Sequence, residues 1–145
     1  TTNFLSYHAA EPVSVRGFEG EVQWEWAGGS RLGLNYTFTG PEGINAIRIP
    51  KHKVNIFAQA RLGKRFSALV RYGFTGTRAD TDFNTFTQVE LEPFSLVDLR
   101  LDYHLMPGKL DAFISATNLF DESFTEVLGF QTPGRNVMVG WTLKL

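Results

Sequence analysis

Apolar and polar residues alternate along most of this chain with a period of two. In residues 13–26, Phe18, Val22 and Trp24 fall on one face, whereas the intervening positions are mostly glutamate. Successive side chains of a β-strand point to opposite sides, so this pattern predicts a strand with one apolar and one polar face. The same alternation recurs in segments 31–39, 53–62, 66–77, 95–105, 110–118 and 135–145, and no segment has a convincing helical period. The sequence therefore predicts an all-β, antiparallel protein with about seven strands.

The segments between the predicted strands are alternately short and long. Short turns that contain glycine fall at 27–31, 62–65 and 106–109, and long connections cover 40–53, 76–93 and 121–134. Short turns at one rim and long loops at the other are typical of outer-membrane β-barrels, whose turns face the periplasm and whose loops face the outside of the cell. On this pattern the first strand runs towards the periplasm, and Leu145 lies at the periplasmic rim.

A soluble antiparallel sandwich would show the same alternation, so two further features are needed to distinguish it from a membrane barrel. Aromatic residues gather near strand ends on the apolar faces, as in the interfacial girdles of membrane barrels: Trp24, Trp26, Tyr36, Phe38, Tyr72, Phe74 and Tyr103. The apolar faces also mix alanine and glycine with large rings, whereas a sandwich core favours closely fitted aliphatic residues. Both features favour an antiparallel transmembrane β-barrel. A soluble β-sandwich that acts as a binding module is retained as an alternative.

Composition and charge narrow the classes of function. The 145 residues carry a formal net charge of −1, which gives no electrostatic reason to expect nucleic acid as a partner. The chain has no cysteine, so it has no disulfides, thiolate metal sites or cysteine nucleophiles. Its first residues have neither the basic region nor the apolar core of a signal peptide. We therefore expect a mature chain or a piece of a longer one.

Several motifs occur in an order that resembles the TonB-dependent outer-membrane receptors. The closing run contains Asn118-Leu119-Phe120-Asp121, then Gly129-Phe130, then Pro133-Gly134-Arg135 and a final alternating strand. Upstream, Gly17-Phe18-Glu19-Gly20-Glu21 is similar to the family's Gly-x-Glu-x-Glu strand. Segments 48–55, RIPKHKVN, and 96–103, LVDLRLDY, resemble two further recurring segments. The resemblance extends over nearly the whole chain.

The resemblance implies that residues 1–145 are the C-terminal part of a barrel of about 22 strands, with the plug domain and the N-terminal strands absent. It implies a place in the bacterial outer membrane, among lipid and lipopolysaccharide. The implied function is uptake of a scarce solute, such as a ferric siderophore, haem or cobalamin, without an enzymatic step or a cofactor. The implied partners are the missing N-terminal part, the TonB complex, the small-molecule solute and a surface lipoprotein. The alternative is a small structural or adhesive outer-membrane barrel without transport.

The resemblance also implies three sets of site residues. Residues expected to contact the solute from the extracellular loops are Arg48, Lys51, Arg78, Phe83, Phe86, Phe124 and Phe130. Residues expected to face the plug from the lumen are Glu19, Glu21, Arg61, Arg71, Asp98 and Arg100. Residues expected to guide barrel assembly from the last strand are Gly140, Trp141, Leu143 and Leu145. Leu145 departs from the family pattern, because chains of this class usually end in phenylalanine or tryptophan.

A calcium-like spacing occurs in the second long connection. Asp80, Asp82 and Asn84 place oxygen-bearing side chains at alternate positions, as at the start of an EF-hand loop. However, Thr85 stands where such a loop needs glycine, and Leu91 stands where it needs glutamate. A solvated loop is therefore the better interpretation.

The remaining candidate chemistry is also weak. His8, His52 and His104 have no metal-ligand spacing. Ser95, Asp98 and His104 lie on or beside one predicted strand, without the nucleophile elbow that accompanies a hydrolase triad. The sequence therefore predicts neither a metal site nor a catalytic site.

Overall fold

The computed structural model describes residues 14–26, 28–42 and 46–144. Every regular element within these residues is a β-strand, and every strand pair is antiparallel. The described residues contain no helix of the length and apolarity needed to cross a membrane. The prediction of an all-β antiparallel fold is therefore confirmed.

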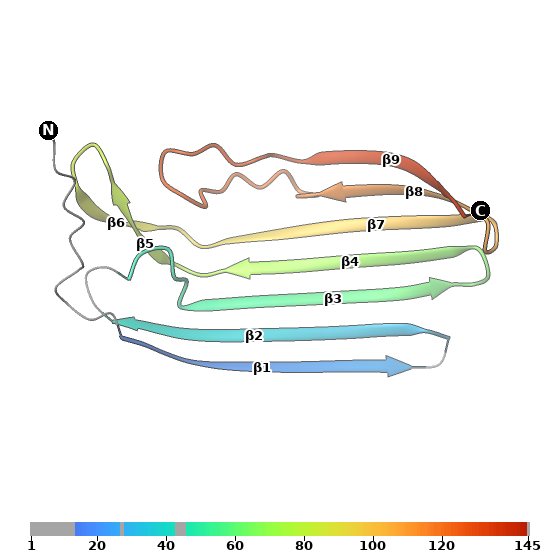
Figure 1. Cartoon of the computed structure of the whole chain (residues 1–145), viewed down its shortest axis with the longest axis horizontal. Coiled ribbons are helices and arrows are strands. Elements are labelled where there is room, and N and C mark those ends of the chain that lie inside the picture. The colour runs from blue at the N-terminus through green and yellow to red at the C-terminus, as the bar shows by residue number, and fades with distance from the viewer. Residues whose placement is uncertain (1–13, 27, 43–45, 145) are drawn as a thin grey trace, which may run out of the picture.

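Seven strands form one sheet in the order β1-β2-β3-β4-β7-β8-β9 (Figure 1). Their bounds are Ser14–Trp26 for β1, Ser30–Glu42 for β2, His52–Leu62 for β3, Phe66–Thr75 for β4, Phe94–Met106 for β7, Leu110–Thr117 for β8 and Asn136–Leu143 for β9. These strands are the seven that the alternation predicts. Figure 1 shows the short turns β3–β4 and β7–β8 at one end of the sheet and the long connections β4–β7 and β8–β9 at the other.

A second, two-stranded sheet lies within the connection between β4 and β7. It consists of β5 (Arg78–Asp82) and β6 (Thr87–Leu91), which pair antiparallel. The sequence predicted a loop over 76–93, and that prediction was wrong for this hairpin. Each strand has only five residues, which is too short for alternation to separate it from its polar surroundings.

The strand register aligns the apolar positions of neighbouring strands. Val22 lies opposite Leu34, Leu34 opposite Ile56, Ile56 opposite Tyr72, and Tyr72 opposite Val97. A shift by one residue would turn every side chain of a strand to the other side, so this alignment depends on a consistent register throughout. We call this side of the sheet the outer face.

The opposite side of the sheet carries polar positions in the same continuous way. Glu21 lies opposite Asn35, Asn35 opposite Asn55, and Asn55 opposite Gly73. We call this side the inner face. The outer face is therefore suited to an apolar environment, and the inner face to a polar one.

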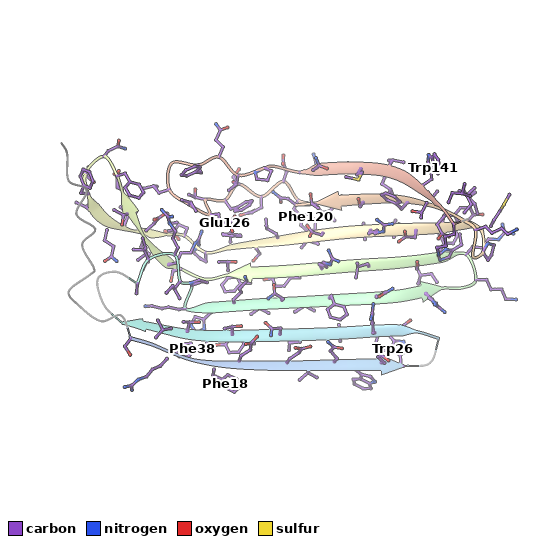
Figure 2. The ribbon with its side chains drawn as sticks, viewed as in Figure 1. Phe18, Trp26, Phe38, Phe120, Glu126 and Trp141 are labelled. Atoms are coloured by element: carbon purple, nitrogen blue, oxygen red, sulfur yellow. The ribbon has the colours of Figure 1, made fainter. Side chains whose placement is uncertain are left out.

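The outer face has no protein cover within the described chain. Val22, Trp24, Val139 and Trp141 expose 65%, 68%, 74% and 72% of their surface, and the described apolar residues that are buried are Ala46 and Leu91. Figure 2 shows outer-face rings such as Phe18, Trp26, Phe38 and Trp141 along the single layer of strands. A soluble sandwich would bury such a face under a second sheet. The exposed face instead matches a lipid-facing wall.

Two inner-face rings each cover a glycine on the neighbouring strand. A Cβ at Gly33 would lie 2.2 Å from Cε1 of Phe57, and a Cβ at Gly140 would lie 2.6 Å from Cζ of Phe113. On its other side Phe113 meets Arg100, whose Cζ lies 3.9 Å from the ring centroid. The missing side chain at Gly140 thus lets one ring join β7, β8 and β9.

The assembly residues of β9 divide between the two faces. Gly140 lies on the inner face, opposite Phe113, whereas Trp141 and Leu143 lie on the exposed outer face. Leu145 lies outside the described residues. An assembly role for these residues stays a prediction.

We expect Gly140→Val to destabilise the pairing of β8 with β9, because the new side chain displaces the Phe113 ring and breaks its contact with Arg100. Loss of an aromatic and cation contact costs about 1–2 kcal/mol. Chemical denaturation of the assembled barrel, followed by tryptophan fluorescence, measures the effect.

A double-mutant cycle supplies the control for Gly140. In a Phe113→Ala background, Gly140→Val should cost far less, because no ring remains to be displaced. An equal cost in both backgrounds would show that Phe113 is not the reason for the glycine.

Candidate functional site

The inner face carries the charged residues that were predicted to line a lumen. All six lie on it, as their register with the row through Glu21 and Asn55 requires: Glu19, Glu21, Arg61, Arg71, Asp98 and Arg100. Their contact with a plug is not tested by this arrangement and stays a prediction. The arrangement does bring the six residues to one side of one sheet.

Five of these six charges have no ion pair among the residues that the structure describes, and Arg100 is the exception. Glu19 accepts a hydrogen bond from Asn35 at 2.9 Å, and Glu21 accepts one from Gln23 at 2.6 Å, so both carboxylates have neutral partners. The guanidinium of Arg71 makes no hydrogen bond or ion pair within the described ranges. These groups are therefore free to contact something that lies on the inner face.

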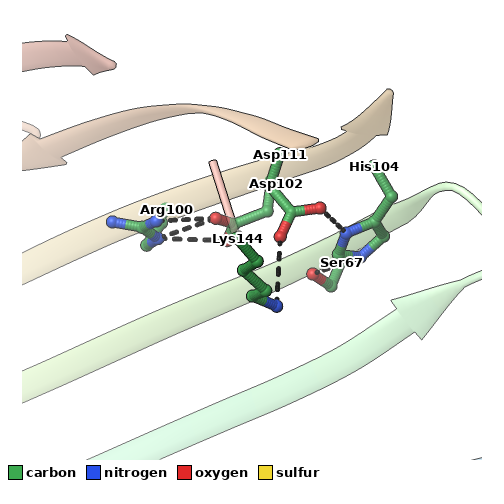
Figure 3. Close-up of polar contacts among 6 residues, drawn as sticks. All are labelled: Ser67, Arg100, Asp102, His104, Asp111 and Lys144. Atoms are coloured by element: carbon green, nitrogen blue, oxygen red, sulfur yellow. Dashed lines mark hydrogen bonds and ion pairs between the residues drawn. The ribbon is translucent and has the colours of Figure 1, made fainter. Parts of the chain in front are cut away.

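Arg100, in contrast, is satisfied within the sheet. Its Nη2 donates to Oδ1 of Asp102 at 2.7 Å, and its Nε lies 3.0 Å from both carboxylate oxygens (Figure 3). Its stacking on Phe113 fixes the plane of the guanidinium. Arg100 thus contributes to the structure of the wall.

Asp80 joins the three long connections. Its side chain is completely buried, and it accepts hydrogen bonds from Nε of Arg48 at 2.9 Å and from the backbone amides of Thr81 and Leu128 at 2.8 Å. Arg48 belongs to the connection before β3, and Leu128 belongs to the connection before β9. The amide of Arg48 also donates to the carbonyl of Ala79 at 2.7 Å. One carboxylate therefore holds segments that are far apart in the sequence.

The ionisation of Asp80 follows from these contacts. Burial by itself would raise the pKa of the carboxyl group, but the amides of Leu128 and Thr81 and the Arg48 guanidinium outweigh it and hold the pKa below its usual value. Asp80 is therefore an anion at neutral pH, and its donors are matched to that charge.

Arg78 is a second buried tie between the loops. Its side chain donates to backbone carbonyls of Gly76, Glu92, Thr125 and Glu126. Its Cζ lies 5.1 Å from the ring centroid of Phe94. Burial lowers the pKa of the guanidinium, and the charges of Glu126 and Asp80 oppose that effect. Arg78 was predicted to contact solute, but its contacts here lie within the loops.

The Asn-Leu-Phe-Asp and Pro-Gly-Arg motifs close the last connection upon itself. Oδ1 of Asp121 accepts the amide of Arg135 at 2.7 Å, and a Cβ at Gly134 would lie only 2.8 Å from that oxygen. Asn118 exchanges hydrogen bonds with the backbone of Glu122 at 2.9 Å in both directions. Both Asn118 and Asp121 adopt positive φ, of 49° and 58°. These contacts give the motifs a structural reason.

The structure does not gather the remaining loop residues predicted for solute into one site. Phe83 and Phe86 are exposed at the tip of the β5–β6 hairpin, and Phe130 is exposed in the last connection. Lys51 precedes β3, and its carbonyl accepts the amide of Thr39. Phe124 is the exception in position, because it lies over the sheet with its ring centroid 4.5 Å from that of Phe94.

A cavity of about 620 Å³ lies between the inner face and the last connection. Phe57, Arg71 and Gly73 line it from β3 and β4, and Phe94 lines it from β7. Phe124 lines it from the last connection. The cavity therefore combines the wall and a loop, and it contains one of the unpaired cations.

Ser95, Asp98 and His104 do not form a triad. The hydroxyl of Ser95 lies 3.1 Å from that of Tyr72, and Asp98 accepts the amide of Asn118 at 3.1 Å. His104 contacts other residues. The three side chains are thus used separately.

His104 belongs instead to a polar cluster near the short turns (Figure 3). Its Nδ1 lies 2.7 Å from Oδ1 of Asp111, and its Nε2 lies 3.5 Å from Oγ of Ser67. The other oxygen of Asp111 lies 3.6 Å from Nζ of Lys144. The sequence did not suggest this cluster, because β4, β7, β8 and the residue that follows β9 each contribute to it. At 3.5 Å the serine contact is at the limit of a hydrogen bond and does not activate a nucleophile.

No metal centre is formed within the described ranges, where no three histidine or carboxylate side chains are placed to hold an ion. Asp82 accepts the amide of Asn84 at 2.8 Å in an exposed turn, whereas Asp80 points into its buried contacts. The two carboxylates do not converge.

The family model described as TonB dependent receptor-like, beta-barrel, matches residues 1–119. This chain belongs to the TonB-dependent receptor β-barrel family. The match confirms the resemblance that the motifs indicated. Proteins of this family are outer-membrane transport receptors, which agrees with the expected class and membrane.

Solved structures of such receptors have the same fold. The Pseudomonas aeruginosa receptor FpvA bound to a heterologous ferric pyoverdine superposes with a TM-score of 0.78 at 19% identity, over 89% of this chain and 19% of that one. The ferric-catecholate import receptor Fiu of Escherichia coli K12 gives a TM-score of 0.76 at 18% identity, over 89% of this chain and 20% of Fiu. A complex of FpvAI with pyocin S2 gives 0.75 at 19% identity, over 89% of this chain and 19% of FpvAI. The chain thus spans about a fifth of the length of these receptors.

We expect Asp80→Ala to loosen the last connection of this barrel. Two backbone amides and Arg48 lose their acceptor, and each unsatisfied buried donor costs about 1–3 kcal/mol. Hydrogen–deuterium exchange over residues 121–134 of the assembled receptor should become faster by about tenfold or more. The matched control is Asp82→Ala in the same hairpin, because that carboxylate accepts only the amide of Asn84 in an exposed turn. Equal effects of the two substitutions would contradict the role of Asp80.

The contacts that Asp80 makes with the last connection should weaken only at acid pH. Because the pKa of Asp80 is lowered in the folded state, its contribution is complete above the unfolded value of about 3.9 and is lost as the pH falls through the folded value. Exchange over 121–134, corrected for its intrinsic pH dependence, should therefore stay constant from neutral pH to about pH 5 and accelerate only in stronger acid. Loss of protection near pH 6 would indicate that another group controls the tie.

Proposed function

We propose that this chain is the C-terminal part of the barrel wall of a TonB-dependent receptor that imports a scarce solute, of which a ferric siderophore is the first candidate. The N-terminal strands and a plug domain complete the receptor, and the TonB complex acts through the plug. No bond of the solute is made or broken.

The open sheet carries this proposal. Within the described part of the chain, β1 and β9 each have a neighbour on one side only, although the outer face between them is suited to lipid. Unpaired N–H and C=O groups in hydrocarbon cost several kcal/mol each, so a sheet of this kind must be closed by further strands. A chain that covers about a fifth of its structural neighbours leaves room for those strands and for a plug.

The two ends of the sheet support an orientation. We place the short turns and the C-terminus at the periplasmic rim and the long connections outside the cell, among lipopolysaccharide. In that orientation the long connections, which Asp80 and Arg78 hold together from within, face the medium, where a surface lipoprotein would meet them.

The two sets of side chains then have distinct roles. Residues of the inner face with unmatched charge, Glu19, Glu21, Arg61 and Arg71, are available to the plug or to solute within the lumen. Exposed rings on the loops, Phe83, Phe86 and Phe130, make the first contact with solute, together with Arg48 and Lys51. Phe124 contacts it where the loops meet the wall.

Uptake by whole cells tests the proposal. Cells that produce the complete receptor should accumulate radiolabelled iron supplied as ferric siderophores, and collapse of the proton gradient or loss of TonB should abolish accumulation while surface binding remains. A receptor without this chain's segment is the negative control. Uptake that persists without TonB would contradict the proposal, and so would binding of no solute by a correctly folded receptor.

A further inference from the structure

Charge is distributed unequally between the two ends of the sheet. The charged residues of the short turns β3–β4 and β7–β8 are all basic, and a further lysine follows β9: Lys64, Arg65, Lys109 and Lys144. We call these four residues the basic rim. In the described part of the long connections, acidic residues outnumber basic ones. The acidic residues there are Asp80, Asp82, Glu90, Glu92, Asp121, Glu122 and Glu126, and the basic ones are Arg48, Lys51, Arg78 and Arg135.

The carboxylates closest to the basic rim lie on the inner face. They are Glu25, Asp102 and Asp111, and each has a basic residue bound to it or opposite it in the register. In this half of the sheet, the described positions of the outer face carry no charged residue. A cation that reaches the outer face at this end therefore meets no counter-charge from the wall.

Arg65 is such a cation. Its Nη1 donates to the hydroxyl of Tyr103 at 3.2 Å, and Tyr103 lies on the outer face opposite Phe66. The rings of Tyr103 and Phe66 are packed together, with centroids 4.8 Å apart. Arg65 is exposed and has no ion pair within the described residues. The O–H of Tyr103 and the remaining N–H groups of Arg65 are therefore available to donate to an anion.

The outer face continues from Tyr103 as a row suited to lipid. Tyr103 lies opposite Ala112, and Ala112 lies opposite the exposed Trp141. Figure 2 shows Trp141 and Trp26 at the end of the sheet where the short turns lie. Tryptophan and tyrosine rings are typical of the headgroup level of a membrane. The small side chain of Ala112 leaves space between two rings, in which an acyl chain fits.

We propose that Arg65 and Tyr103 bind the phosphate of an anionic phospholipid in the periplasmic leaflet. Arginine and a hydroxyl together match the oxygens of a phosphodiester, and the other cations of the basic rim favour a headgroup with net negative charge. The glycerol and one acyl chain lie along Ala112, between Tyr103 and Trp141. The choice of leaflet rests on the orientation given under the proposed function, whereas solute uptake does not enter the argument.

An acidic protein segment is the competing occupant of the basic rim. It would meet the rim from the inner side, where Arg61, Lys64 and Lys144 line a cavity of about 610 Å³. That cavity also contains Asp111, which already lies 3.6 Å from Nζ of Lys144. Arg65 contacts a tyrosine of the outer face instead, so the lipid side is favoured.

Lipid binding to the complete receptor in a nonionic detergent tests the site. Native mass spectrometry measures the affinities for dioleoylphosphatidylglycerol, which is anionic, and for dioleoylphosphatidylethanolamine, which has the same acyl chains but no net charge. A basic residue at a membrane surface raises the affinity for anionic lipid by about fivefold. Arg65→Gln should therefore weaken phosphatidylglycerol by about fivefold and phosphatidylethanolamine by less than about twofold, because the ammonium group of the latter offsets its phosphate. Arg65→Lys keeps the charge without the paired donors and should restore part of the loss.

Two further variants complete the test. Tyr103→Phe keeps the ring and removes the donor, so it should weaken phosphatidylglycerol by about threefold. Arg16→Gln is the matched control, because Arg16 is an exposed cation on the outer face at the opposite end of the sheet, facing Gly40 across the β1–β2 pair. It should leave both affinities unchanged. All variants should keep the melting temperature of the receptor, because the substituted groups are exposed or retain their packing.

The outcomes separate this inference from the function on which it rests. Equal weakening of the two lipids by Arg65→Gln would show lipid contact without selection for charge and would overturn the inference. Loss of phosphatidylglycerol on Lys64→Gln and Lys144→Gln, but not on Arg65→Gln, would place the ligand on the inner side and would overturn it as well. Solute uptake stands in both cases. If lipopolysaccharide depends on Arg65 and phosphatidylglycerol does not, the proposed orientation is reversed, and the inference is overturned together with it.

Discussion

The structure depends on one constraint: every backbone N–H and C=O group of the wall must be paired by a neighbouring strand in the same register. That register fixes which side chains of each strand lie on the outer face and which lie on the inner face. A slip by one residue would exchange the row through Val22 with the row through Glu21. Lipid on one side and water on the other tolerate no such exchange. The five strands between β1 and β9 satisfy the constraint within the described residues, whereas β1 and β9 have a neighbour there on one side only.

The long connections are ordered by different contacts, because they lie outside the seven-stranded sheet. Their order comes from buried charge, with Asp80 accepting two amides and Arg48. Arg78 donates to carbonyls on both sides of β5–β6 and on the last connection. Removing one partner of such a contact is costly, because the other charge or amide is left buried. The long connections are thereby held as one block at the end of the wall opposite the short turns.

This difference explains how much the sequence could predict. The seven strands of the wall follow from local alternation, because both faces are fixed by their surroundings. Val22 and Trp24, for example, alternate with Glu21, Gln23 and Glu25. The β5–β6 hairpin was missed, since its order depends on Arg48 and Leu128, which are distant in the sequence. The cover of Gly140 by Phe113 and the His104 cluster were missed for the same reason, as each requires knowledge of which strands are neighbours. The spacing of Asp80, Asp82 and Asn84 resembles the start of a calcium loop, but the carboxylate of Asp80 accepts hydrogen bonds from protein groups instead.

The wall and the long connections meet at the cavity beneath the last connection. A wall fixed by its register holds Arg71 and Phe57 in place, and a loop block fixed by charge holds Phe124 above them. A site built only on the loops would lose precision whenever they moved, and a site built only on the wall would lie out of reach of the medium. At the junction, side chains fixed by the wall and a ring fixed by the loop contacts line one space. The two parts are also joined directly, because Asp98 of β7 accepts the amide of Asn118 and Arg78 lies over Phe94. The order of the loop block therefore depends on the register of the wall beneath it.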